Sequence, residues 1–255
     1  MYARQHAEEH PGQPAIIMAT SGETVTYGEY ESRCNRAAHL LRAAGLERGE
    51  HIAVMMENSP RLLEIEGAAE RTGLYFTLIN TYLAPNEVAY IAGNSGARML
   101  FTSPACAEVA VAAAAKCPAV GRRLITGPGE PPAGWESYEA AVEGYPGAPV
   151  PGETLGTAML YSSGTTGQPK GILRGLPEIS PSDPLPVMLF VRNMFGFREG
   201  MTYLNPTPST TRRRRRASPH HCGSVPRPWS WSTSTRSSGW RWSSAIRSPT
   251  ARWSL

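Results

Sequence analysis

Between residues 26 and 45 the apolar side chains repeat at intervals of three and four. This spacing predicts one buried face of an amphipathic helix. Thr26 and Glu29 fit the capping box that begins such a helix, and Gly45 fits a left-handed stop. The positions that share the spacing are Tyr27, Tyr30, Cys34, Ala37, Leu41 and Ala44.

Shorter apolar runs further along the chain predict strands separated by helices. Strands are predicted at Ile52–Met56, Leu74–Ile79, Met99–Thr102 and Arg122–Thr126. Helices are predicted to begin at Asn58-Ser59-Pro60 and to cover Pro85–Ala92 and Pro104–Lys116. This alternation favours an α/β fold with a mainly parallel sheet covered by helices on both faces. The segment Gly127–Gly152, rich in Pro and Gly, is predicted to be a long connection between subdomains.

A polar segment, Ser162–Gly171, follows a predicted strand at Thr157–Tyr161. Two of its glycines, Gly164 and Gly167, would let the backbone approach a ligand. Its hydroxyls and N–H groups would donate, and Lys170 would add positive charge, as phosphate binding requires. It is not a Walker A loop, because Pro169 precedes Lys170 and no Ser or Thr follows. Composition alone would favour a flexible surface turn.

Apolar residues at Met188–Val191 and Met194-Phe195 precede a further predicted strand, Met201–Leu204. Core packing is the favoured interpretation of this stretch. The wall of an acyl pocket is the alternative.

The eleven residues Tyr161–Gly171, in their order, resemble the AMP-binding signature of the adenylate-forming superfamily. That superfamily includes acyl-CoA synthetases, luciferases and peptide-synthetase adenylation domains. Val25–Tyr30, Gly49–Val54 and Asn80–Leu83 also occur in family-like order. The resemblance covers Pro14–Pro208, the first part of such an enzyme. It implies that residues 1–206 are an incomplete N-terminal portion of the large domain.

The resemblance further implies an ATP-dependent acyl-CoA synthetase of the fatty-acid–CoA ligase group. Such an enzyme joins a carboxylate to ATP, releases pyrophosphate, and passes the acyl group to CoA; Mg²⁺ assists. No catalytic residue and no metal ligand is assigned here, because the family's main catalytic lysine lies in a C-terminal domain. We therefore expect a truncated member of this group that lacks synthetase activity. The alternative is a remnant that binds a nucleotide without catalysing a reaction. The residues expected to bind the ATP phosphates are Ser162, Ser163, Gly164, Thr165, Thr166, Gly167 and Lys170.

Charge divides the chain into two unlike parts. The 255 residues carry a net charge of +4 and a pI of about 9.0. Residues 1–206 hold 15 basic and 21 acidic side chains, whereas residues 207–255 hold ten Arg and no acid. Five of the six Trp lie in this tail, and no helical or strand period persists. The composition predicts a disordered tail.

Two hypotheses explain the tail. Arg212–Arg216 with the interleaved Trp would suit a nucleic-acid-binding arm. Alternatively, the tail is read out of frame in a GC-rich gene: permitted codons for Ser209–Arg215, regrouped, give Tyr-His-Ala-Ala-Pro, which resembles the family's next motif. Trp229–Ser232 regroups in the same way to Val-Val-Val. The frameshift is favoured, so no specific nucleic-acid partner is expected and His220-His221-Cys222 is not interpreted as a metal site.

Other features exclude further classes. No run of about 18 apolar residues is present, and Met1–His10 lacks the apolar core of a secretory signal. The four Cys lack C-x-x-C spacing, which favours free thiols in a reducing compartment. A cytoplasmic location is expected.

Overall fold

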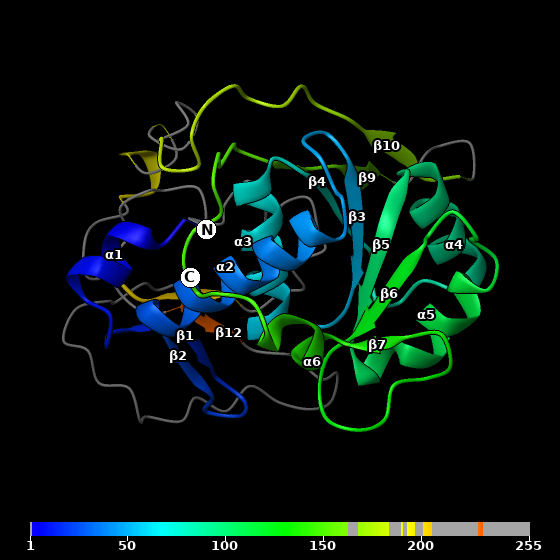
Figure 1. Ribbon diagram of the computed structural model, residues 1–255, viewed down its shortest axis with the longest axis horizontal. Coiled ribbons are helices and arrows are strands. Elements are labelled where there is room, and N and C mark those ends of the chain that lie inside the picture. Colours follow the sequence, from blue (N-terminus) through cyan, green and yellow to red (C-terminus); the bar gives the residue numbers. More distant parts are fainter. Residues whose placement is uncertain are drawn as a thin grey trace, which may run out of the picture.

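The computed structural model describes residues 2–162, 168–183, 190, 193–196, 201–205 and 229–231. Within these residues, six strands form the larger sheet in the order β7-β6-β5-β3-β4-β8, and every neighbouring pair is parallel (Figure 1). This confirms the predicted α/β class. The strands are β3 (His51–Met55), β4 (Tyr75–Leu78), β5 (Ala97–Thr102), β6 (Arg122–Ile125), β7 (Glu136–Ser137) and β8 (Thr157–Ala158).

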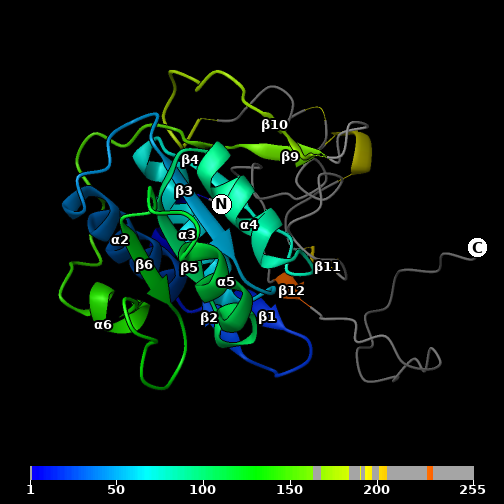
Figure 2. The ribbon, with the colours of Figure 1, turned by 90° about the vertical axis from the view of Figure 1, so that its right-hand side faces the viewer.

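Helices cover both faces of this sheet, as predicted. Figures 1 and 2 show α2 (Tyr27–Ala43) and α3 (Pro60–Thr72) on one side, and α4 (Pro85–Asn94) and α5 (Ala107–Ala114) on the other. Successive residues of β3 alternate between the two sides: Ile52 and Val54 belong to the cluster beneath α2, while Ala53 and Met55 belong to the cluster beneath α4. Burial on both faces explains why the strand reads as one continuous apolar run.

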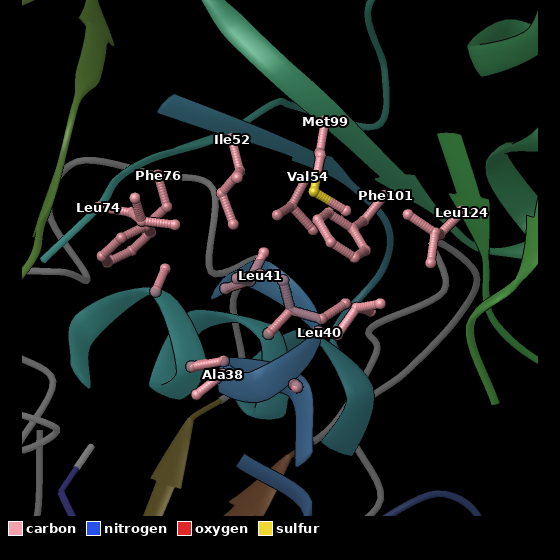
Figure 3. Close-up of a cluster of buried hydrophobic side chains, with 14 of the residues drawn as sticks. Ala38, Leu40, Leu41, Ile52, Val54, Leu74, Phe76, Met99, Phe101 and Leu124 are labelled. Atoms are coloured by element: carbon pink, nitrogen blue, oxygen red, sulfur yellow. The ribbon is translucent and has the colours of Figure 1, made fainter. Parts of the chain in front are cut away.

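The first of these clusters fills the space between α2 and the sheet. Leu40 and Leu41 of α2 point toward Val54, Phe76 and Phe101 (Figure 3). All five side chains are at most 1% exposed. The predicted stripe divides between two clusters: Ala37 and Leu41 pack here, whereas Tyr27, Tyr30 and Cys34 pack in a separate cluster near the N-terminus. Leu40 was not part of the predicted stripe.

Both helices that carry this core begin at the predicted signals, and α2 also ends at its predicted glycine. The Thr26 hydroxyl accepts from the Glu29 N–H at 3.3 Å, and the Glu29 carboxylate accepts from the Thr26 N–H at 2.8 Å. Gly45 has a φ of 73°. Ser59 caps α3, which ends at Gly73. The capping box and the glycine stop are confirmed.

A second sheet lies beside the N-terminus, in the order β11-β12-β1-β2, with α1 (Arg4–Glu9) nearby. The strands are β1 (Pro14–Met18), β2 (Thr24–Thr26), β11 (Tyr203–Asn205) and β12 (Trp229–Trp231). The apolar pattern did not predict α1, β1, β2 or β12. Strand β11 begins two residues later than expected.

Strand β12 belongs to the tail for which no element was predicted. It pairs in parallel with both β1 and β11. Backbone hydrogen bonds form such a ladder, so a three-residue strand needs no side-chain pattern. The rest of the tail lies outside the described residues, and its disorder stays a prediction.

The segment Gly127–Gly152 is not a simple connection between subdomains. It contributes β7, which extends the main sheet beside β6, and then α6 (Tyr138–Glu143). Arg122 of β6 and Glu136 of β7 form a salt bridge at 2.7 Å, and Ser137 caps α6. A two-residue strand and a six-residue helix are too short to show a period, which is why the pattern missed them.

Two further expectations need correction. The single strand expected at Thr157–Tyr161 is two strands, β8 and β9 (Leu160–Ser162), which belong to different sheets. Core packing is wrong for Phe190, Met194 and Phe195, which are 57–62% exposed. Residues 188, 189 and 191 lie outside the described part.

Candidate functional site

The predicted phosphate-binding segment begins and ends in a β-hairpin. β9 and β10 (Lys170–Ile172) are antiparallel, with Lys170 opposite Ser162 and Gly171 opposite Tyr161. The hairpin therefore brings two of the seven predicted residues, Ser162 and Lys170, together at the base of the loop. The other five lie outside the described residues: Ser163, Gly164, Thr165, Thr166 and Gly167.

Gly171 allows the two strands to approach. A Cβ at this position would lie 2.5 Å from the Met159 Cε and 3.2 Å from the Tyr161 Cζ. The ring of Tyr161 thus occupies the space that any larger residue at 171 would need. The signature contains Gly171, but sequence reasoning assigned it no role.

Tyr161 also anchors the hairpin to α4. Its hydroxyl donates to the Asn94 Oδ1 at 2.6 Å. Burial raises the pKa of Tyr161 to about 12, so the phenol stays protonated and can donate at neutral pH. Asn94 lies 67 residues earlier in the chain, and no sequence signal marks it.

The hairpin is also tied to strand β4 of the main sheet. The Met159 N–H donates to the Phe76 carbonyl at 3.0 Å, and the Tyr75 hydroxyl donates to the Arg174 carbonyl. These bonds hold the chain before β9 and after β10 against β4. Figures 1 and 2 show β9 and β10 near α4, at the end of the molecule away from α6.

The described donors of the hairpin suit an oxyanion. Lys170 is exposed and Ser162 is half-buried, and in the described part of the chain no acidic side chain pairs with Lys170. An ammonium and a hydroxyl at the mouth of one loop can both donate to phosphate oxygens. Within the described residues, no group of three or more His, Cys, Asp or Glu side chains is placed to hold a metal ion.

Two other functional classes receive no support from the described residues. Cys34, Cys106 and Cys117 are free and buried, and burial raises the pKa of the Cys34 thiol to about 12, so it is a poor nucleophile. Among the described helices, none has the length and apolar character to cross a membrane.

Comparisons with curated proteins find relatives over about two thirds of the chain. It is 33% identical over 168 residues to the "Fatty acid--[acyl-carrier-protein] ligase ScoC" of Streptomyces coeruleorubidus, covering 66% of this chain and 31% of the relative. It is 32% identical over 165 residues to the "3-hydroxybenzoate--CoA ligase" of Aromatoleum sp. (strain CIB), covering 63% and 31%. The chain thus spans about a third of the length of these relatives.

Solved structures share the fold. An anthranilate CoA ligase, AuaEII, in complex with anthranoyl-AMP, matches with a TM-score of 0.76 at 20% identity, covering 89% of this chain and 43% of that one. The N-terminal domain of FACL13 from Mycobacterium tuberculosis matches with a TM-score of 0.71 at 22% identity, covering 91% and 56%.

The family model described as "AMP-binding enzyme" matches residues 3–176, which begins and ends earlier than the expected Pro14–Pro208. The match includes the main sheet and the whole hairpin. It covers well over half of the 255 residues. This chain therefore belongs to the AMP-binding enzyme family.

Proposed function

We propose that residues 1–206 are the N-terminal part of an ATP-dependent acyl-CoA synthetase, and that the β9–β10 hairpin binds the ATP phosphates. In this reaction a carboxylate oxygen attacks the α-phosphorus of ATP, and the bond to pyrophosphate breaks. The sulfur of CoA then attacks the acyl carbon, and AMP leaves. The observation that carries the proposal is the pairing of Ser162 with Lys170 across the hairpin.

The chemistry of the first step explains why such a hairpin would help. Attack on the α-phosphorus builds negative charge on the phosphate oxygens. Donors fixed in advance stabilise that charge without reorganising. Tyr161 and Gly171 hold the hairpin closed, so Lys170 and Ser162 would meet the phosphates from a rigid base.

A fatty acid is the proposed acyl substrate. Two relatives support it: the Streptomyces coeruleorubidus ligase is named for a fatty acid, and a Mycobacterium tuberculosis relative, 29% identical, is named "Long-chain-fatty-acid--CoA ligase FadD13". Other relatives are named for aromatic acids, including 3-hydroxybenzoate and 4-coumarate. Aromatic acids are therefore the comparison in any substrate test.

We further propose that the chain as printed binds ATP without completing the synthetase reaction. It spans about a third of its relatives' length. Its described residues supply two of the proposed phosphate donors, Ser162 and Lys170, at the base of the hairpin.

The composition allows a sharp labelling test, because the chain contains only two lysines, Lys116 and Lys170. Lys116 is exposed in the turn after α5 and donates to the Asn86 Oδ1 at 2.6 Å. An aldehyde-bearing ATP analogue, reduced in place and located by peptide mass spectrometry, should label Lys170 much more than Lys116. Excess ATP should protect Lys170. Equal labelling of both lysines would contradict the proposed site.

Binding and exchange assays on variants separate an enzyme from a nucleotide-binding remnant. Lys170→Ala should weaken ATP binding, measured by calorimetry, whereas Lys116→Ala should not. The unmodified chain should give no ATP–pyrophosphate exchange with fatty or aromatic acids. Robust ATP–pyrophosphate exchange that depends on the acid would show that the chain is an active enzyme. If the chain does not bind ATP, it is neither an enzyme of this kind nor a nucleotide-binding remnant.

For the tail we propose a shifted reading frame. Strand β12 lies between two parallel neighbours, β1 and β11. Parallel strands with neighbours on both sides are typically Val- and Ile-rich, whereas this one reads Trp-Ser-Trp. Regrouped codons would give Val-Val-Val there. Reading the coding DNA across Ser209–Arg215 tests the proposal, since third bases that do not encode Tyr-His in the shifted frame would reject it.

A further inference from the structure

A polar cavity lies away from the hairpin, where α2, the start of α3 and α6 meet. Its volume is about 530 Å³, a size typical of small-molecule sites. Figures 1 and 2 place α6 and the β9–β10 hairpin at different ends of the molecule. The cavity is therefore distinct from the proposed ATP site.

Two carboxylates, those of Glu64 and Glu139, form ion pairs with arginines that line the cavity. Glu64, 2% exposed, accepts from Arg33 at 3.2 Å and from Arg61 at 2.6 Å. Glu139 accepts from Arg61 at 3.2 Å and from the Gly127 N–H at 3.1 Å. These contacts occupy the carboxylates and fix the two guanidinium groups in place.

Donors remain after these bonds are counted. Each guanidinium carries five N–H groups, and among the described contacts Arg33 uses one of them and Arg61 uses two. Arg36 is exposed, lines the same cavity, and pairs with no described residue. The cavity therefore offers more donors than its own acceptors use.

Tyr138 supplies an independent observation. Its side chain is 1% exposed and lines the cavity, yet its hydroxyl has no hydrogen-bond partner among the described residues. A buried hydroxyl without a partner costs free energy, so a ligand that accepts from it would be favoured. The ring is held by Phe101, edge to face, with centroids 6.2 Å apart. Tyr138, with its unpartnered hydroxyl, is thus held in the wall of the cavity.

We propose that this cavity binds the phosphate group of a small molecule, through Arg36, the remaining N–H groups of Arg33 and Arg61, and the Tyr138 hydroxyl. Guanidinium groups match phosphate oxygens in charge and in fork geometry. Glu143, exposed at the same cavity, is the carboxylate that opposes such a ligand. The site needs no contribution from the hairpin.

Calorimetric titration of the full chain with inorganic phosphate tests the proposal. The Lys170→Ala background removes the proposed ATP site, and phosphate binding should persist in it. In that background, Arg36→Gln should weaken binding about tenfold, the effect of losing one charge-assisted hydrogen bond. Arg42→Gln removes the same charge from the same helix outside the cavity and should change little.

Two conservative variants make the test specific. Tyr138→Phe keeps the packed ring and removes only the hydroxyl, so binding should weaken while thermal unfolding changes little. Glu143→Gln should tighten binding, because it removes the opposing charge. Absence of phosphate binding, or equal losses in Arg36→Gln and Arg42→Gln, would overturn the proposal.

Discussion

Gly171 and Gly156 are among the glycines that are required by close contacts and not by backbone conformation. Gly171 lies under the Tyr161 ring, and a Cβ at Gly156 would lie 2.4 Å from the carbonyl oxygens of Ala69 and Leu74. Backbone atoms cannot move aside as a flexible side chain can. Gly156 is therefore the less tolerant position of the two.

Gly156→Ala should destabilise the fold strongly, by about 3 kcal/mol, since overpacking of a closed site has costs of this order. Urea unfolding at neutral pH measures the change. Gly175→Ala is the matched control, because a Cβ there meets nothing within 4 Å. Equal stability of the two variants would mean that the 156 backbone is free to shift.

The capping box of α2 makes a second prediction about single residues. Thr26→Ala should cost about 1 kcal/mol, the usual effect of losing an N-cap. Two hydrogen bonds from Thr26 lower the pKa of the Glu29 carboxyl. The backbone N–H has the larger effect and the side-chain hydroxyl the smaller one. The folded-state pKa lies below the unfolded one, so the stability that Glu29 adds is present above the unfolded pKa and is lost as pH falls through the folded pKa.

Glu29→Ala should accordingly destabilise the protein at pH 7, and its difference from the unmodified chain should shrink on acidification below about pH 4.3. Unfolding free energies across that range measure it. A difference that stays constant with pH would contradict the assigned role.

Packing between α2 and α3 depends on a buried ion pair. Arg71 is fully buried and donates to both Glu31 oxygens, at 2.9 and 3.1 Å, as well as to Asn35. Such a pair contributes little net stability, but breaking it leaves an uncompensated buried charge. The loss of stability on removing Arg71 alone must therefore be compared with the loss on removing Arg71 and Glu31 together.

Arg71→Met should destabilise the chain by about 3–5 kcal/mol. The double variant Arg71→Met/Glu31→Leu should regain much of that loss, because no charge stays unpaired. Chemical denaturation of the two variants decides this. A double variant no more stable than the single one would show that the pair itself, not the stranded charge, matters.

The junction between α4 and the hairpin is the second contact between elements that can be tested. Tyr161→Phe removes one hydrogen bond to Asn94 and should cost about 1 kcal/mol. The Asn94→Ala change should add little once the hydroxyl is gone. A double-mutant cycle with ATP affinity as a second readout tests whether the contact also positions Lys170.

Six large apolar side chains are exposed in the part of the chain that the structure describes. Tyr82, Leu173 and Leu204 are 82%, 56% and 53% exposed, and Phe190, Met194 and Phe195 are also exposed. The chain matches only about a third of its relatives' length. Exposed apolar groups on such a piece favour self-association.

The double variant Leu173→Ser/Leu204→Ser should lower aggregation without lowering the unfolding temperature, because both side chains are exposed. Light scattering against protein concentration measures the first, and calorimetry the second. Leu41→Ser, at a buried position, should instead destabilise the fold. Unchanged aggregation in the double variant would show that other surfaces drive it.

Local patterns predicted much of the main sheet and its helices. Long periodic segments such as α2, with strong capping and glycine signals, were predicted nearly to the residue. Buried strands such as β3 were predicted because both of their faces are apolar. Short elements were missed: β7 and α6 hold too few residues to show a period, and β12 depends on its partners in the ladder.

The proposed phosphate-binding segment shows the same division. Its residue types could be read from the sequence because Ser, Thr, Gly and Lys occur together in order between Tyr161 and Gly171. Its anchoring was not readable, because Asn94 and Phe76 lie far away in the chain. The Arg36–Tyr138 cavity had no sequence signal, since its residues come from three separate elements.

The amino-acid sequence by itself determined the α/β class, both ends of α2, the start of α3 and the residue types of the Ser162–Gly171 segment, because these follow from interactions between near neighbours. Tertiary structure alone decided that Ser162 faces Lys170 on a separate hairpin, that Gly156 has no space for a side chain, and that three helices enclose an arginine-lined cavity. Those properties arise from contacts between distant residues, and a linear pattern holds no record of which distant residues meet.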